Sequence, residues 1–297
     1  CSHCPVGCIH IAALREPYAD ESYFYKTSMI AYDYEPIYAL GAMVGVTDTE
    51  GLLQLIDCVE VYGLDAMSTG VVLAWATEAR EKDIISESET QGIRLAWGDW
   101  RAYREAIVQI VEQPNEFYRT LARGVTSAAA RYGGREFALA LGNNEMPGYH
   151  TGPGAYAGYA TGARHSHLDS AGYSIDQTML LKGDLTPEGL ARELLAEERW
   201  RQILASLAVC FFARGIYQPE VAADALSVAG FNCTAQGLKD LGVEIHREKY
   251  RFKLREGFSL DTLHLPPRIF ETPAPAGRLN EQFIRDTLAC VKKEVCQ

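Results

Sequence analysis

The stretch DTEGLLQLIDCVEVYG, residues 48–63, carries the clearest fold signal in this chain of 297 residues. Asp48 is a residue type that caps helix starts, and it is followed by a good helix-forming run. Leu55 and Val59, four residues apart, place apolar side chains on one face of that helix. Gly63 is the residue type that ends helices. The stretch therefore predicts a helix over residues 48–62.

Similar start and stop signals recur along the chain. Ser68 is an N-cap residue type, Thr186 followed by Pro187 is a strong helix start, and Gly133 is a stop. Helices are predicted over residues 68–82, 101–113, 116–132, 219–229, 234–241 and 280–293, and from residue 186 toward residue 210. Strand-like alternation is scarce, and no internal repeat is found. The pattern predicts an all-α, multihelical fold.

Composition narrows the class of protein. The formal net charge of −11 argues against nucleic acid or an anionic membrane as a partner. The longest apolar run, residues 203–213, is too short to span a bilayer. No signal peptide appears in this sequence, which opens directly on Cys1, so we expect it to be the later part of a longer chain. We expect a cytoplasmic protein with no membrane span.

One stretch interrupts the helical pattern. Residues 142–162 contain six glycines, interleaved with tyrosines, and lead into Arg164-His165-Ser166-His167. A glycine-rich loop lets backbone approach a ligand closely, although a long interdomain connection has the same composition. We place a domain boundary near residue 140, giving a helical domain over 1–140 and a second over 141–297.

Three of the eight cysteines crowd into CSHCPVGC, residues 1–8. Cys1, Cys4 and Cys8 have the spacing C-x2-C-x3-C, which lets thiolates on a tight loop reach three irons of one [4Fe–4S] cubane. The fourth iron then takes a remote cysteine. A disulfide framework would be unusual in a chain this long with this much apolar content. The sequence therefore predicts an iron–sulfur cluster.

The fourth cluster ligand stays open on the residues alone. The remaining cysteines are Cys58, Cys210, Cys233, Cys290 and Cys296. Cys58 falls on an apolar helix face, where a free cysteine usually packs. Zinc is the alternative metal, with His3 available, but zinc sites more often pair two C-x2-C knuckles. Molybdoenzymes of the dimethyl-sulfoxide-reductase type share the spacing, but their α/β body does not match this helical pattern.

Six motifs follow one another along the chain. They are C-x2-C-P-x2-C at 1–8, DYEPIYALG at 33–41, EVYGLD at 60–65 with STG at 68–70, GYAT at 158–161 with Arg164 and His167, LAVCF at 207–211, and REGF at 255–258 with PPR at 266–268. In this order they resemble the second and third domains of the aldehyde ferredoxin oxidoreductase family, the tungsten (sometimes molybdenum) bis-pterin enzymes. The resemblance covers essentially the whole chain.

The resemblance implies two helical domains packed around a cofactor site. It implies Cys210 as the fourth cluster ligand and Asp65 as an acceptor for pterin N–H groups, a task that suits the several lone pairs of a carboxylate. The cofactor-binding residues that it implies are Glu60, Gly63, Leu64, Asp65 and Val209. Without the resemblance, Asp65 would be interpreted as a helix cap.

This chain departs from the second pterin motif of the family. Ala205 stands where the family has an aspartate, and Ala208 stands where it has a glycine. Glu60 also replaces the usual first residue of the first motif. The departure weakens the case for side-chain anchoring of the second pterin, while backbone contacts near Cys210 remain available.

Two residues are candidates for catalysis under the same resemblance. Glu35 could take a proton from water that attacks an aldehyde carbon, and His167 could hydrogen-bond the substrate. A solvated loop residue and a surface residue at a helix start are the corresponding structural interpretations. His150 and His165 are secondary candidates.

The resemblance implies oxidation of a small aldehyde to a carboxylic acid, with electrons leaving through the cluster to a ferredoxin or a ferredoxin-like subunit. The family's N-terminal β-rich domain is absent from this sequence, so we expect no activity from this piece alone. A homo-oligomer stays open. The alternatives are the tungsten subunit of another family member, such as an aromatic acyl-CoA reductase, and a non-enzymatic zinc-binding helical protein.

Overall fold

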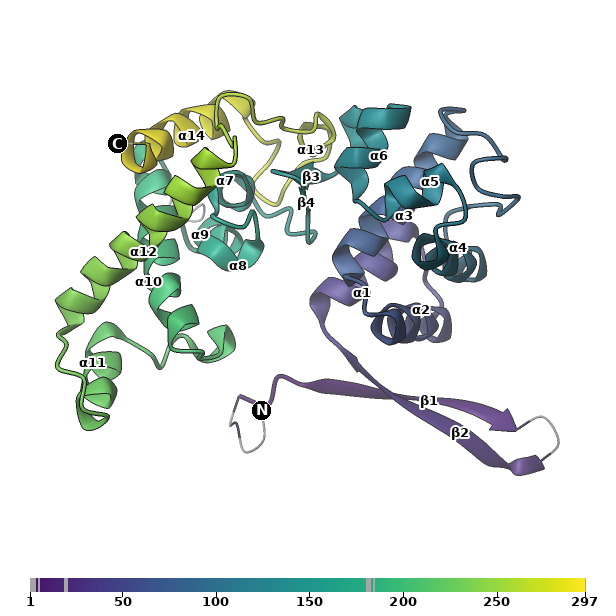
Figure 1. Cartoon of the computed structure of the whole chain (residues 1–297), viewed down its shortest axis with the longest axis horizontal. Coiled ribbons are helices and arrows are strands. Elements are labelled where there is room, and N and C mark those ends of the chain that lie inside the picture. Colours follow the sequence, from purple (N-terminus) through teal and green to yellow (C-terminus); the bar gives the residue numbers. More distant parts are fainter. Residues whose placement is uncertain (1–3, 5, 19–20, 180–182, 184, 297) are drawn as a thin grey trace. The chain divides into compact units, whose positions relative to one another are not determined.

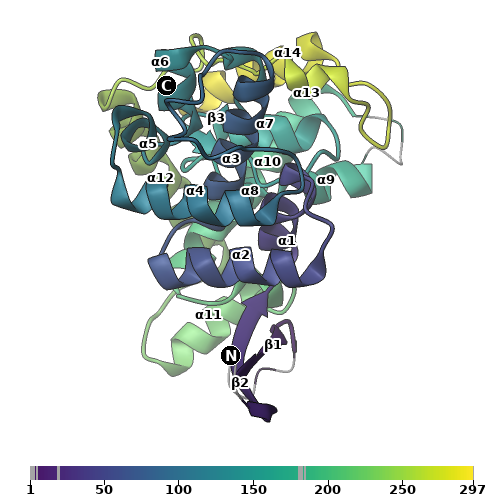
Figure 2. The same ribbon diagram turned by 90° about the vertical axis from the view of Figure 1, so that its right-hand side faces the viewer.

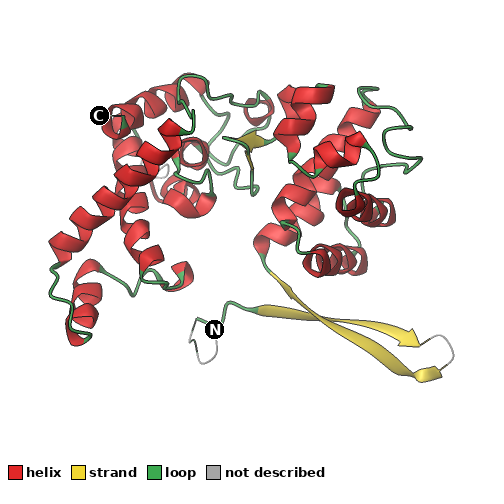
Figure 3. Cartoon of the chain, in the orientation of Figure 1, coloured by secondary structure: helices red, strands yellow, loops and turns green. Residues whose placement is uncertain are grey.

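The computed structural model describes residues 4, 6–18, 21–179, 183 and 185–296. Over these residues the chain is mostly helical, with two small two-stranded sheets (Figures 1 and 3). The all-α prediction is confirmed. The chain forms two compact units and passes from the first to the second between Gly148 and Tyr149, while Cys4 and Val6 group with the second unit.

The first unit is a set of helices with a β-hairpin at its start. Its elements are β1 His10–Tyr18, β2 Glu21–Tyr32, α1 Tyr34–Leu40, α2 Thr49–Tyr62, α3 Ala66–Glu81, α4 Trp100–Glu112, α5 Glu116–Leu121, α6 Val125–Tyr132, β3 Ala140–Leu141 and β4 Asn144–Glu145. Helices α2 and α4 lie side by side, and α1 packs on α3 (Figures 1 and 2).

Helix α2 forms as the sequence predicts. The Asp48 carboxylate accepts a hydrogen bond of 3.0 Å from the Gly51 backbone N–H, and Gly63 ends the helix with a left-handed φ of +67°. Leu55 and Val59 are fully buried in the core of the first unit. Capping fixes the two ends of α2, and burial of its apolar face fixes its orientation.

The hairpin of β1 and β2 was not expected from the sequence. Its antiparallel register runs from His10 opposite Tyr32 to Pro17 opposite Tyr25. Among the described side chains of the hairpin, Leu14 and Ile30 are the ones buried in the core of the unit. Because so few positions face the core, the alternation that marks a strand is weak.

Three predicted helix boundaries were wrong. The helix predicted over 234–241 continues to Arg255 as α12 Ala235–Arg255, because Gly242 does not end it but packs closely against the Arg199 backbone. Helix α3 begins at Ala66, two residues before the predicted start, because the Asp65 carboxylate caps it by accepting from the Ser68 N–H at 2.7 Å. The single helix predicted over 116–132 is two helices, α5 and α6, separated at Gly124 with φ +94°. Left-handed backbone at that residue interrupts the helical ladder.

The second unit is built around helix α10. Its helices are α7 Pro153–Thr161, α8 His167–Ser170, α9 Gly172–Met179, α10 Pro187–Ser206, α11 Pro219–Val228, α12 Ala235–Arg255, α13 Arg268–Glu271 and α14 Glu281–Val295. Helices α12 and α14 both pack on α10. The predicted start of α10 is confirmed, since the Thr186 hydroxyl accepts from the Gly189 N–H at 3.1 Å.

The stretch over 142–162, predicted as a glycine-rich loop, contains the nine-residue helix α7. Its glycines serve close packing: a Cβ on Gly172 of α9 would lie 1.9 Å from the Gly154 carbonyl oxygen of α7. The N-terminus of α7 is capped from α9 by the buried Asp176, which accepts from Gly154 N–H and Ala155 N–H at 2.7 and 2.9 Å. Among the described helices, none combines the length and the apolar character that a membrane span requires.

Candidate cofactor and catalytic site

The candidate cluster ligands that the structure describes are accessible thiols. Cys4 and Cys210 are exposed, Cys8 is half-buried, and all three are free. Cys1 lies outside the described residues. Although Cys4 stands near the start of the chain, it groups with the second unit, which also contains Cys210. Thiols that bind a cluster have to be reachable, and this set has that property.

Three of the four competing cysteines pack against apolar cores. Cys58 is only 7% exposed in the core of the first unit, and burial raises its pKa. Cys233 and Cys290 pack against apolar clusters of the second unit. Cys296 is exposed at the end of α14. Burial therefore favours Cys210 over Cys58 as the remote ligand.

The described thiols are not gathered into a metal site in this structure. Among described residues, no three Cys, His, Asp or Glu side chains form a group that could hold a metal ion. Cys4, Cys8 and Cys210 fit a cluster by donor chemistry and accessibility, and Cys1 lies outside the described residues.

The first motif ends helix α2 in a Schellman turn. Gly63 N–H donates to Glu60 O at 3.1 Å, and Leu64 N–H donates to Val59 O at 2.9 Å. Glu60, Gly63 and Asp65 are exposed, while Leu64 packs partly against the core. Space is open around Gly63, where an added Cβ would meet no atom within 4 Å. The turn thus presents backbone and a carboxylate to the surroundings of the unit.

The second motif ends helix α10 in the same turn. Ala208 N–H donates to Ala205 O at 3.1 Å, and Val209 N–H donates to Leu204 O at 3.2 Å. Ala208 has a left-handed φ of +55°, the conformation that glycine adopts most easily. The two motifs therefore share one backbone geometry, in which Cys210 stands where the first turn has Asp65. The sequence identified the two segments as a first and a second pterin motif, but it did not predict that they share this turn geometry.

Glu35 lies in the first turn of α1 and is half-buried, so its interpretation as a solvated loop residue was wrong. Its neighbour Tyr34 stacks on Tyr38 with ring centroids 6.2 Å apart. Burial and then the Glu35 charge raise the pKa of Tyr34. Glu35 is therefore a carboxylate beside a phenol, on a helix of the first unit.

His167 is the first residue of α8 and is buried, with 7% of its surface exposed. The alternative interpretation of His167 as a surface residue at a helix start is therefore wrong. Its ring stacks on Tyr149 at 5.2 Å, and Tyr149 in turn stacks on Tyr173 at 4.3 Å. Contacts with Tyr149 and with Tyr173 of α9 restrict the orientation of the His167 ring, which suits a proton-handling group.

A buried carboxylate fixes the turn before His167. Asp169 accepts from Arg164 N–H at 2.9 Å, from Ser166 N–H at 3.1 Å and from Arg164 Nε at 2.8 Å. Ser166 and Asp169 form a capping box at the start of α8. The spacing S-x-x-D was readable in the sequence, although Asp169 was not singled out.

Side chains of helices α10 and α12 also bond to the backbone just before this turn, at residues 161–163. Glu198 accepts from Ala163 N–H at 2.8 Å, Lys253 donates to Gly162 O at 2.8 Å, and Tyr250 donates to Thr161 O. Burial lowers the pKa of Lys253 to about 8. These partners lie 35 to 91 residues away in the sequence, so no local pattern could reveal them.

The secondary candidates have structural partners. His165 is buried, and its Nδ1 lies 2.7 Å from Tyr159 O. Burial and then Lys253 lower its pKa to about 4, so it is neutral near pH 7. The ring nitrogens of His150 lie beside the Tyr156 hydroxyl and, at 2.9 Å, Thr272 O.

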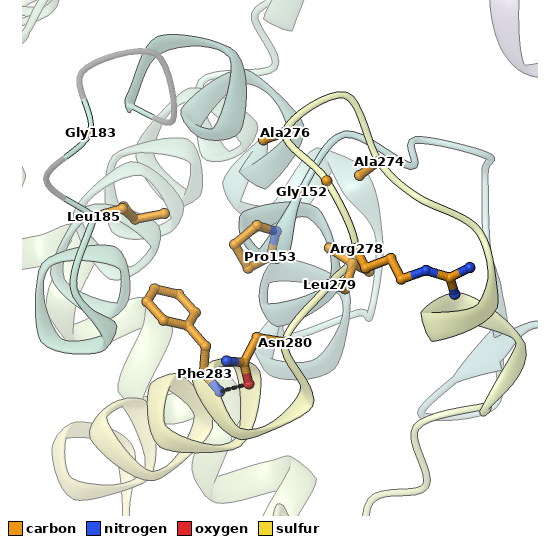
Figure 4. Close-up of a pocket in the computed structure, with 11 residues that line it drawn as sticks. Gly152, Pro153, Gly183, Leu185, Ala274, Ala276, Arg278, Leu279, Asn280 and Phe283 are labelled. Atoms are coloured by element: carbon orange, nitrogen blue, oxygen red, sulfur yellow. Dashed lines mark hydrogen bonds between the residues drawn. The ribbon is translucent and has the colours of Figure 1, made fainter.

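A cavity of about 280 Å³ lies elsewhere in the second unit (Figure 4). Pro153, Leu185 and Phe283 contribute apolar walls, and Asn280 lies at its rim, where it caps α14. None of the candidate catalytic, cofactor-binding or metal-ligating residues lines it. The cavity therefore adds no residue to the candidate site.

Comparison with known proteins places these motifs in a family. A family model described as aldehyde ferredoxin oxidoreductase, domains 2 and 3, matches residues 1–294. The chain belongs to this family. It is 27% identical over 290 residues to the tungsten-containing aldehyde ferredoxin oxidoreductase of Pyrococcus furiosus, across 93% of this chain and 46% of that protein. The relative with the same description from Thermococcus kodakarensis is 27% identical over 298 residues, across 96% and 47%.

Two further similarities concern other reactions. The aliphatic sulfonate oxidoreductase, WOR-like subunit, of Pyrococcus furiosus is 34% identical over 129 residues, 43% of this chain and 19% of that protein. A solved structure, the active site complex BamBC of benzoyl coenzyme A reductase with 1,5-dienoyl-CoA, aligns at a TM-score of 0.70 and 16% identity, over 92% of this chain and 47% of that chain. The structural match supports the fold. These matches cover nearly all of this chain but 46–47% of the two aldehyde ferredoxin oxidoreductases and of the benzoyl coenzyme A reductase chain. The chain therefore spans about half the length of these proteins.

Proposed function

We propose that this chain, within a longer protein, takes part in oxidising a small aldehyde to a carboxylic acid with water as the oxygen donor. Electrons would leave through a [4Fe–4S] cluster to a ferredoxin or a ferredoxin-like subunit. Family membership supports an oxidoreductase, and the tungsten in the names of the relatives supports a tungsten bis-pterin cofactor, with molybdenum as the alternative metal. That cofactor, when bound, supplies the two-electron redox chemistry.

The observation that carries the proposal is the matched pair of turns. Each ends a long helix with a left-handed residue, Gly63 or Ala208, and then presents one chemical group, Asp65 or Cys210. Asp65 keeps lone pairs beyond the one that caps α3, so it can accept from a pterin N–H. Cys210 supplies a thiolate. One turn geometry thus serves recognition in the first unit and metal ligation in the second.

The proposed cofactor set follows from these turns and from the C-x2-C-x3-C motif at residues 1–8. The proposed cluster ligands are Cys1, Cys4, Cys8 and Cys210, and the proposed pterin contacts come from Glu60, Gly63, Leu64, Asp65 and Val209. Because Ala205 has no polar side chain, the second turn contributes backbone groups and its thiol alone.

The proposed catalytic roles fall on Glu35 and His167. Glu35 takes the proton of the attacking water, and the neighbouring Tyr34 phenol keeps its own proton because its pKa is raised. His167 hydrogen-bonds the substrate oxygen from a fixed ring orientation. Both groups handle protons and leave the electrons to the cofactor.

Aldehyde turnover by the full-length protein tests this function. We expect the wild type to reduce an acceptor dye with an aldehyde, and His167→Gln to lower kcat by roughly 10²–10⁴. His264→Gln is the matched control, since His264 lies outside every motif of the candidate site. Wild-type activity that survives His167→Gln unchanged would remove His167 from the mechanism.

A second candidate function is reduction of an aromatic acyl-CoA. Two observations favour this second function. The fold is similar to that of the benzoyl-CoA reductase complex, and position 205 carries an alanine. The two functions separate in one assay, because the aldehyde oxidase consumes aldehydes and the acyl-CoA reductase does not. The zinc-binding alternative predicts neither activity, and bound zinc without iron.

A further inference from the structure

The guanidinium of Arg201 contacts both segments of the second unit that carry candidate chemistry. Arg201 lies in the last turns of α10 and is 2% exposed. Its Nη1 donates to Leu168 O at 2.9 Å, and its Cζ lies 5.1 Å from the centre of the Phe211 ring. Leu168 directly follows His167, and Phe211 directly follows Cys210. One side chain therefore touches the neighbours of both residues.

The remaining nitrogens of this guanidinium show how the buried charge is held. Nε donates to the Glu197 carboxylate at 2.7 Å, and Glu197 is 36% exposed, so the pair is neutralised at the edge of the core. Nη2 is buried and bonds to none of the described residues. A buried cation with one orphaned donor is costly for folding. Arg201 is therefore poorly explained by stability alone.

We propose that Arg201 is a positioning residue that fixes the backbone beside His167 and the turn at Cys210 to one another. This inference rests on the function proposed above. Arginine suits the role because its rigid planar fork can bond in two directions while its face stacks on a ring. Through these two contacts one guanidinium joins the short helix α8 to the turn after Cys210.

The link has an electrostatic consequence. Removing the Arg201 cation would leave the Glu197 carboxylate unpaired, so the surroundings of Phe211 and Cys210 would become more negative. Because reduction adds negative charge, the reduction potential of the proposed cluster would then fall. The same guanidinium donates to the backbone carbonyl of Leu168, the residue that follows His167. Arg201 thus fixes the segment at His167 and the turn at Cys210 relative to one another. It also raises the reduction potential of the cluster proposed at Cys210.

Hydrogen exchange in the full-length protein tests the mechanical half. The reporters are Ala171 N–H, which bonds His167 O, and Ala213 N–H, which bonds Cys210 O. In Arg201→Met we expect both amides to exchange about tenfold faster. The matched control is Arg192→Met, an exposed arginine on the same helix, which should change neither amide.

The reduction potential of the cluster and the steady-state kinetics test the proposed effect of Arg201 on function. We expect Arg201→Met to lower the midpoint potential of the cluster, followed by electron paramagnetic resonance, and to lower kcat about tenfold with KM little changed. Arg201→Lys keeps the charge and loses the fork. It should recover most of the potential and little of kcat, and it replaces the methionine variant if that protein does not fold.

Three results would overturn the proposal. They are faster exchange at only one of the two amides, faster exchange spread evenly over the second unit, and unchanged potential and kcat in Arg201→Met. Full-length protein without iron would end the proposed cofactor assignment and leave the link testable, because paired exchange at Ala171 and Ala213 is measured on the protein itself.

Discussion

At the scale of single residues, Ala208 adopts a left-handed backbone conformation that is unfavourable for alanine. Its φ of +55° places the Cβ against its own carbonyl, which costs about 1 kcal/mol or more for a residue other than glycine. The family resemblance implies a glycine at this position. The turn geometry has therefore been kept here while the residue best suited to it has changed.

The first prediction follows from that strain. Ala208→Gly should raise the free energy of unfolding by about 0.5–1 kcal/mol in urea titrations, because relief of strain exceeds the added chain entropy. The reciprocal change Gly63→Ala is the matched control and should lower stability by about 1 kcal/mol, since the space around Gly63 is open and the left-handed φ is its only cost. Loss of stability in both variants would refute this account of the turn.

The second prediction concerns His165 and acid stability. The folded protein holds the His165 pKa at about 4, while the unfolded chain protonates near pH 6.5. Because the unfolded state then binds more protons, stability is complete above pH 6.5 and falls as the pH drops toward 4. The difference amounts to about 3 kcal/mol at most. Asp176, with its pKa raised to about 6, opposes this trend.

We expect His165→Asn to remove the acid-induced loss, because asparagine tolerates the left-handed φ of +58° and carries no titrating group. Urea titrations at pH 6.5 and pH 4.5 measure it. Asp176→Asn should show the opposite change in slope, as a control on sign. Parallel pH curves for wild type and His165→Asn would contradict the buried, neutral histidine.

At the scale of elements, local signals in the sequence predicted most helices and failed where distant partners decide. Caps at Asp48 and Thr186 were readable because the partners lie within three residues. Helix α7 was missed because its cap, Asp176, comes from α9, more than twenty residues away. Its glycines resembled a loop, since only the neighbouring helix explains them.

The same difference between local signals and distant partners separates the predicted residues of the candidate site from the ones that were not predicted. Cys4, Cys8, Cys210 and Asp65 came from motifs that any sequence comparison reads in order. The residues that hold His167 in place, such as Arg201 and Glu198, are separated from it in sequence and were not foreseen. Side chains that position a site through space leave no periodic signal in the chain.

The third prediction tests the packing explanation for α7. Gly172→Ala would place a Cβ 1.9 Å from the Gly154 carbonyl oxygen and force α7 and α9 apart. We expect a loss of about 1–3 kcal/mol in urea titrations, as for other overpacked cores. Gly215→Ala is the control, because nothing lies within 4 Å of a Cβ there. Equal stability of the two variants would restore the loop interpretation.

At the scale of the whole molecule, the candidate cofactor groups lie on the surfaces of two separate helical units. The turn at Gly63 belongs to the first unit, and the thiols of Cys4 and Cys210 belong to the second. The chain matches its tungsten-enzyme relatives over about half of their length. Exposed ligands on helical supports are suited to a cofactor that further protein encloses.

Metal analysis of the full-length protein, purified without oxygen, tests the central claim most directly. The account predicts about four irons per chain, matching acid-labile sulfide, and tungsten or molybdenum. Cys210→Ser should lose iron, while the control Cys58→Ala, which alters a buried packing thiol, should keep it. Zinc without sulfide in the wild type, or full iron in Cys210→Ser, would contradict the account.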